Sequence, residues 1–100
     1  MGRINISDIV DHCASYENGK AVYDVIVARL LAGECVVLSF EGITSVSTSF
    51  VNAAFIELLG SMDFAVIKRQ LSFSNTNKII NDTIKRRFAF EVQRLKQDVA

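Results

Sequence analysis

The 100-residue chain contains no proline, so its turns must be marked by glycine and by polar residues. No apolar run approaches the roughly 20 residues of a membrane span. The first residues also lack the apolar core and cleavage site of a secretory signal. Internal repeats and low-complexity linkers are absent, and half of the residues are hydrophobic. These features predict one folded domain over residues 1–100, located in the cytoplasm and without a membrane partner.

Cysteine and histidine are scarce, with two cysteines and one histidine. Cys35 lies in an apolar run, which favours a buried thiol over a disulfide. Cys13 follows His12, but two adjacent ligands without a second pair do not form a zinc signature. We therefore predict no metal and no cofactor.

The chain also lacks the motifs of common enzyme classes. It has no glycine-rich phosphate loop, and its single histidine leaves no prospect of a Ser-His-Asp set. Glu41 is a carboxylate near Ser47, but a lone carboxylate beside hydroxyls more often has a solvated or capping role. We predict a protein that is not an enzyme.

Charge is balanced overall but unevenly placed. Residues 1–67 contain eight acids and three bases, whereas residues 68–100 contain eight bases and three acids. This pattern is typical of a solvated basic helix face, with a nucleic-acid surface as the alternative. That surface would use Lys78, Lys85, Arg86, Arg87, Arg94 and Lys96.

Hydrophobic spacing predicts an α/β fold. Strands are expected near residues 4–6, 35–40 and 70–74, and helices over 19–32, 47–60, 61–69 and from 79 towards the C-terminus. The run at 35–40 is typical of a central strand buried on both faces, with helices around it. Residues 16–19 read as a turn, and Gly33 stands where a helix-ending glycine belongs.

The last predicted helix has an apolar stripe that continues to the end of the chain. The stripe consists of Ile79, Ile80, Thr83, Ile84, Phe88, Val92 and Leu95. Residues 90–100 also contain Phe90 and Val99. We expect the apolar side chains of this segment to pack either against their own domain or against a second copy of the chain. A homodimer is therefore a second alternative.

A cluster of hydroxyl residues stands between the central strand and the next helix. Ser47 fits the N-cap position, where a serine stabilises a helix by about 1 kcal/mol. Ser45, Thr48 and Ser49 exceed what capping requires. A phosphate on Thr48 or Ser49 would lie at a helix N-terminus, which favours anions, and would add about −1.5 to −2 charges.

Three short motifs give the chain a recognisable pattern: Leu38–Ile43 ("LSFEGI"), Ser47–Phe50 ("STSF"), and Leu71, Phe73 and Asn75. Together they resemble the STAS domains, and more closely the group of STAS-like domains of unknown function, over about residues 19–90. The resemblance implies a small mixed β-sheet of about four strands with helices packed on it.

The resemblance also implies a function. Bacterial anti-sigma factor antagonists of this kind bind a kinase that doubles as an anti-sigma factor, and phosphorylation at the start of the same helix releases them. By position, Thr48 is the implied phosphoacceptor, with Ser49 as a second candidate. We therefore expect a regulatory module that binds a protein partner, resembling an ATPase, a kinase or another signalling protein. The expected contact residues are Glu41, Thr44, Ser45, Phe50 and Asn52.

The chain departs from the family pattern at four positions. Ser47 occupies the place of the usual Asp, and Phe50 the place of a glycine. Ser39 replaces an Asp, and Ala53 stands where an acid is common. These departures favour binding at this surface over a working phosphoswitch.

Overall fold

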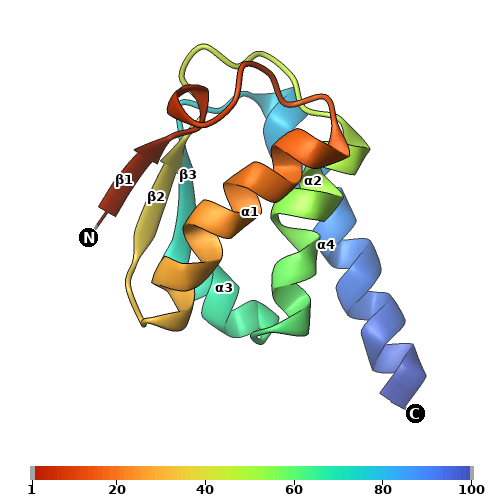
Figure 1. The fold of residues 1–100 in the computed structure, drawn as a ribbon. Coiled ribbons are helices and arrows are strands. Elements are labelled where there is room, and N and C mark those ends of the chain that lie inside the picture. The colour runs from red at the N-terminus through yellow and green to blue at the C-terminus, as the bar shows by residue number, and fades with distance from the viewer. Residues whose placement is uncertain (1, 100) are drawn as a thin grey trace.

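Three strands form one parallel sheet. The structure is a computed structural model that describes residues 2–99, with the side chains of residues 2–95. β1 (Gly2–Asn5), β2 (Val36–Ser39) and β3 (Leu71–Ser74) lie side by side in that order. Ile4 is opposite Leu38, and Leu38 is opposite Phe73. Parallel neighbours require long crossovers, and helices form both of them (Figure 1).

The first crossover contains a short 3-10 turn, η1 (Ile6–Asp8), and the helix α1 (Tyr16–Leu31). The helix begins three residues before the predicted start, because Ser15 caps it and accepts a hydrogen bond from the Asn18 amide at 3.1 Å. The predicted turn at 16–19 is therefore wrong. Gly33 has a φ of +84°, so it ends the helix in the left-handed conformation as predicted.

The second crossover consists of α2 (Thr48–Ala54), a 3-10 turn η2 (Ile56–Gly60) and α3 (Phe64–Gln70). The stretch predicted as one helix over 47–60 thus changes its helix type at Phe55. After β3, Asn75 adopts a φ of +54°, and the Asn77 side chain accepts from the Ile80 amide at 2.8 Å. This bond caps α4 (Lys78–Val99).

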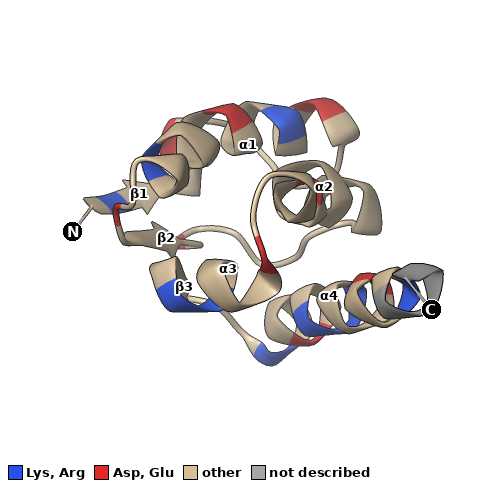
Figure 2. Ribbon diagram, turned by 90° about the horizontal axis from the view of Figure 1, so that it is seen from below, with Lys and Arg blue, Asp and Glu red and all other residues tan. Residues whose placement is uncertain are grey.

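All the helices lie on one face of the sheet (Figures 1 and 2). Leu38 points towards them and is fully buried, whereas Val37 shares the other face with Arg3 and Ser72, which are exposed. β2 is thus the central strand, as predicted. The prediction of helices on both of its faces is wrong, because both crossovers return over the same side.

The sheet also corrects the expected strand count. It has three parallel strands, not about four mixed ones. The apolar residues between β2 and β3 have helical spacing and form the second crossover. They therefore leave no segment for a fourth strand within residues 2–99.

The core contains a group of edge-to-face aromatic rings. Phe55 contacts Phe73 at 5.2 Å and Phe50 at 6.1 Å between ring centroids, and Phe73 contacts Phe40 at 5.8 Å. Cys13 is buried beside this core, and burial raises the pKa of its thiol to about 11. Cys35 is exposed, because β2 begins one residue later, so the prediction that it is buried is wrong.

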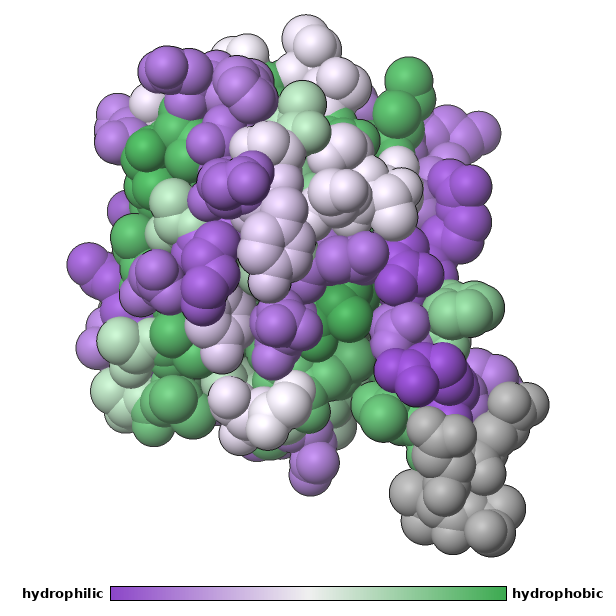
Figure 3. All heavy atoms as spheres, turned by 45° about the vertical axis from the view of Figure 1, so that its right-hand side comes forward, coloured by the Kyte–Doolittle hydropathy of each residue, from purple (hydrophilic) through white to green (hydrophobic). Residues whose placement is uncertain are grey.

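On α4, Ile80, Ile84 and Phe88 are buried, which confirms the central part of the predicted stripe. Ile79 and Leu95 are exposed, so the stripe is narrower and shorter than expected. In Figure 3, the right-hand side of the molecule, where α4 lies, is mostly hydrophilic, with isolated hydrophobic residues. Val99 lies outside the described side chains.

None of the helices within residues 2–99 is by itself both long enough and apolar enough to cross a membrane. The consecutive segments Thr48–Gly60 and Phe64–Gln70 reach the length and composition of a span only together, and they are bent by 116° at the break between them.

Candidate functional site

Three loops meet at the carboxyl ends of the strands, the edge where ligands and partners of parallel sheets usually bind. The loop 41–47 follows β2, the segment 9–15 follows η1, and residues 75–77 follow β3. The Ser47 amide donates to the Cys13 carbonyl at 2.9 Å. The Asn77 side-chain amide donates to the Thr44 carbonyl at 2.9 Å. These bonds join the three loops into one surface.

Ser39 lies buried beneath this surface. It is fully buried, and its Oγ accepts from the Asn75 side-chain amide at 2.9 Å and from the Glu41 amide at 3.2 Å. Ser39 and Asn75 belong to two of the three recognised motifs, so the motifs meet in space. Beside them, Ser74 Oγ is buried without a hydrogen-bond partner among the described residues. The hydrogen bonds of Ser39 with Asn75 and Glu41 therefore anchor the start of the 41–47 loop to the end of β3.

Ser47 is the N-cap of α2, as predicted. Its Oγ accepts from the Phe50 amide at 3.0 Å. The other polar side chains of the junction are exposed: Glu41, Thr44, Ser45, Thr48 and Ser49. Five of the predicted site residues are therefore accessible to solvent.

Two of the predicted contact residues, Phe50 and Asn52, are not fully exposed to solvent. Phe50 is fully buried among the aromatic rings of the core, so the prediction that it contributes to a partner-binding surface is wrong. Its position on α2 turns its ring inward, towards the core between α2 and the sheet. Asn52 is half-buried and accepts a hydrogen bond from Arg87 Nε at 2.8 Å. Its amide therefore fixes an arginine of α4.

That arginine belongs to a pocket that the sequence did not reveal. Val46, Thr48, Thr83, Arg86 and Arg87 line a cavity of about 260 Å³ between the start of α2 and α4. Thr48 and Arg86 lie far apart in the sequence, and no local pattern links them. The packing of α4 against α2 brings Thr48, Arg86 and Arg87 to the wall of the same cavity.

The rest of the basic stretch is partly neutralised. Glu91 accepts from Arg94 at 2.7 Å and from Arg87 at 3.2 Å. The hydrogen bond from Arg94 is the main cause of the lowered pKa of Glu91. Figure 2 accordingly shows basic and acidic residues alternating along α4. Lys96, the last residue of the proposed nucleic-acid surface, lies outside the described side chains.

His12 and Cys13 point in different directions. The Cys13 side chain packs in the core, whereas His12 is exposed and its carbonyl accepts from the Asn18 side-chain amide at 2.8 Å. Within the described part of the chain, no group of three or more histidine, cysteine or acidic side chains is placed to hold a metal ion.

The fold and the loop surface define a small α/β domain, with a parallel sheet covered on one face and a cluster of hydroxyls after its central strand. The family model of the STAS-like domain of unknown function matches residues 18–81, which is more than half of the chain. The chain therefore belongs to this family, as the motifs predicted. The match begins in the first turn of α1, covers β2, the hydroxyl junction and β3, and ends in the first turn of α4. No curated protein and no solved structure gave a match.

Proposed function

We propose that the protein is a non-catalytic regulatory module of the cytoplasm. It binds a protein partner through the loop 41–47 and the start of α2. The partner resembles the ATPase-type kinases and signalling proteins that related STAS domains bind. Phosphorylation of Thr48 weakens this binding.

The observation that carries the proposal is the position of Thr48. Its side chain is exposed, and it shares a cavity with Arg86 and Arg87. Arginine forms strong, charge-assisted hydrogen bonds with phosphate oxygens. A phosphate on Thr48 would therefore share its cavity with the exposed Arg86 and with Arg87, which is already paired with Glu91.

Asn52 supports the same mechanism. Its side chain holds Arg87 Nε at 2.8 Å, and Glu91 holds the other end of the same guanidinium at 3.2 Å. Arg87 is therefore fixed in place, whereas Arg86 is exposed. We infer that Arg86 moves to the phosphate, while Arg87 stays in place with Asn52 and Glu91.

The test is affinity capture from the native cell with the wild-type chain and with Thr48→Asp as bait. A partner held by the wild type and lost with Thr48→Asp supports the proposal. Ser61→Asp is the matched control, because Ser61 is exposed at the end of η2 and outside the three loops. It should retain the partner.

The two parts of the proposal fail separately. If Ser45→Asp and Thr48→Asp both capture the same partner as the wild type, the loop surface does not bind it. If peptide mapping of native protein shows residues 44–52 unmodified under several growth conditions, the phosphorylation step is overturned and the binding surface stands.

A further inference from the structure

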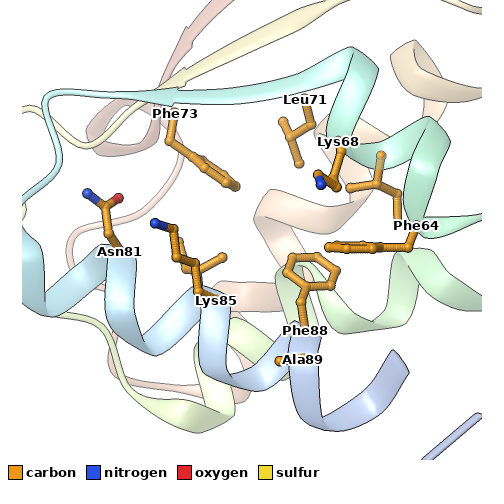
Figure 4. A pocket seen from close by; sticks show the side chains of 10 residues that line it. Phe64, Lys68, Leu71, Phe73, Asn81, Lys85, Phe88 and Ala89 are labelled. Atoms are coloured by element: carbon orange, nitrogen blue, oxygen red, sulfur yellow. The ribbon is translucent and has the colours of Figure 1, made fainter. Parts of the chain in front are cut away.

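A second, apolar groove lies on the other side of α4. It has a volume of about 450 Å³ and runs between β3 and α3 on one wall and α4 on the other (Figure 4). Six large hydrophobic side chains line it: Phe64, Ile67, Leu71, Phe73, Ile84 and Phe88. This volume and lining are typical of a binding site.

The groove lies along the outer edge of the sheet. The Ser74 carbonyl accepts from the Phe40 amide at 2.9 Å, so it points towards β2. Successive residues of a strand direct their backbone groups to opposite sides. The amides and carbonyls of Leu71 and Phe73 therefore point away from β2. The Leu71 amide is used by the end of α3, where it donates to the Ile67 carbonyl.

This geometry leaves three backbone groups for another strand: the Leu71 carbonyl and both backbone groups of Phe73. No strand within residues 2–99 pairs with this edge. Unpaired edges of this kind accept extended segments of other chains, and a groove beside the edge receives alternate side chains of the added strand.

We propose that this groove and the β3 edge bind an extended, acidic–apolar segment of a protein partner. The segment becomes the fourth strand of the sheet. Every second side chain, apolar in character, enters the groove between β3 and α4. At least one carboxylate reaches the lysines at its rim. This site is separate from the Thr48 surface and does not depend on the function proposed above.

The charged residues of the groove indicate which kind of segment it binds. Lys68 and Lys85 come from opposite walls, and no acidic side chain lines the groove (Figure 4). The Lys68 amino group lies 5.6 Å from the centre of the Phe64 ring. Neither lysine has a salt bridge to a described residue. An acidic peptide would therefore supply the missing counter-charges.

The same charges disfavour a second copy of this chain. A two-fold pairing of two β3 edges would bring the lysine-bearing grooves of both copies towards each other. The resulting repulsion would oppose the dimer. An acidic segment of a different protein meets no such repulsion.

The test is selection of random dodecapeptides on the full chain, followed by synthesis of the selected peptides. We expect apolar residues at alternate positions together with Asp or Glu. The double variant Lys68→Glu/Lys85→Glu should weaken binding of a selected peptide by at least about tenfold. Arg3→Glu is the control, because Arg3 is exposed on β1 at the other edge of the sheet and does not line the groove. It should change affinity by less than about twofold.

A second measurement uses the unaltered protein. Bound peptide should shift the Leu71–Phe73 amide resonances and slow hydrogen exchange at the Phe73 amide. This readout decides the matter if the double variant does not fold.

Three results would overturn the proposal. The first is selected peptides with apolar residues at helical spacing, and the second is binding that persists after charge reversal. The third is a dimer of the chain that forms through the groove in sedimentation experiments. Thr48→Asp should leave peptide binding intact, so failure here is distinct from failure of the regulatory proposal.

Discussion

Ser39 and Ser47 hold the two ends of the loop between β2 and α2. Ser39 Oγ accepts from the amide of Glu41, and Ser47 Oγ accepts from the amide of Phe50. Both side chains therefore satisfy backbone donors, and neither is available to a partner. The hydroxyls that remain exposed, including those of Thr48 and Ser49, are the ones that exceed the needs of the fold.

Ser47→Ala should lower the free energy of unfolding by about 1 kcal/mol, because the Phe50 amide loses its acceptor. Urea unfolding followed by circular dichroism measures the change. Ser49→Ala is the control, since Ser49 is exposed and lies two residues further along. Its change should stay within about 0.5 kcal/mol. Equal losses for both variants would contradict the capping role.

Local chemistry makes the Ser47 cap predictable, because capping depends on residues within one turn. The predictions for Phe50 and Cys35 are wrong for the opposite reason. Their exposure depends on where distant elements pack and on the residue at which β2 begins. The Thr48 cavity is beyond prediction, because the arginines that line it belong to another helix.

At the scale of elements, the close contact between α1 and α2 depends on Gly19. A Cβ atom at this position would lie 2.5 Å from the Phe50 carbonyl oxygen and 2.8 Å from the Ala53 Cβ. Glycine is unfavourable inside a helix, yet here it lets two backbones approach each other. The sequence pattern instead places this glycine in a turn before the helix, where its role would be conformational.

Gly19→Ala should lower the free energy of unfolding by about 1–3 kcal/mol or more, because the added methyl group forces α1 away from α2. Thermal unfolding of the purified chain measures the loss. Gly60→Ala is the matched change, since a Cβ atom added there would have no other atom within 4 Å. It should be neutral or stabilise the protein by up to about 1 kcal/mol. A Gly19→Ala protein as stable as Gly60→Ala would show that the helices can separate without cost.

The order of helices and strands is predictable from hydrophobic spacing, which differs between the two. The residue at which α1 begins and the residue at which α2 ends are less predictable. Ser15 caps α1 earlier than its apolar stripe begins, and α2 gives way to η2 within one continuous apolar pattern. The expected fourth strand comes from the family resemblance and has no segment of its own within residues 2–99.

At the scale of the molecule, the sheet is covered on one face only. Leu38 faces the helices and is fully buried, whereas its neighbour Val37 lies on the open face with Arg3 and Ser72. Two adjacent residues of the same strand therefore have very different surroundings. The nearly continuous apolar run at 35–40 does not reveal this difference.

Leu38→Ala should cost about 2–5 kcal/mol of unfolding free energy, because it opens a cavity in the core. Val37→Ala should cost less than about 1.5 kcal/mol, because Val37 is only half-buried. Chemical denaturation of both variants under the same conditions gives the comparison. Similar losses at the two positions would mean that the open face is covered in solution.

The parallel pairing also determines how the chain can fold. Ile4 pairs with Leu38 and Leu38 with Phe73, so each pairing joins residues about 35 positions apart. Neither strand pairing can be closed by a hairpin, and each can form only after the intervening part of the chain has become compact. The chain has no proline, so this assembly avoids the slow isomerisation that takes tens of seconds in many other proteins.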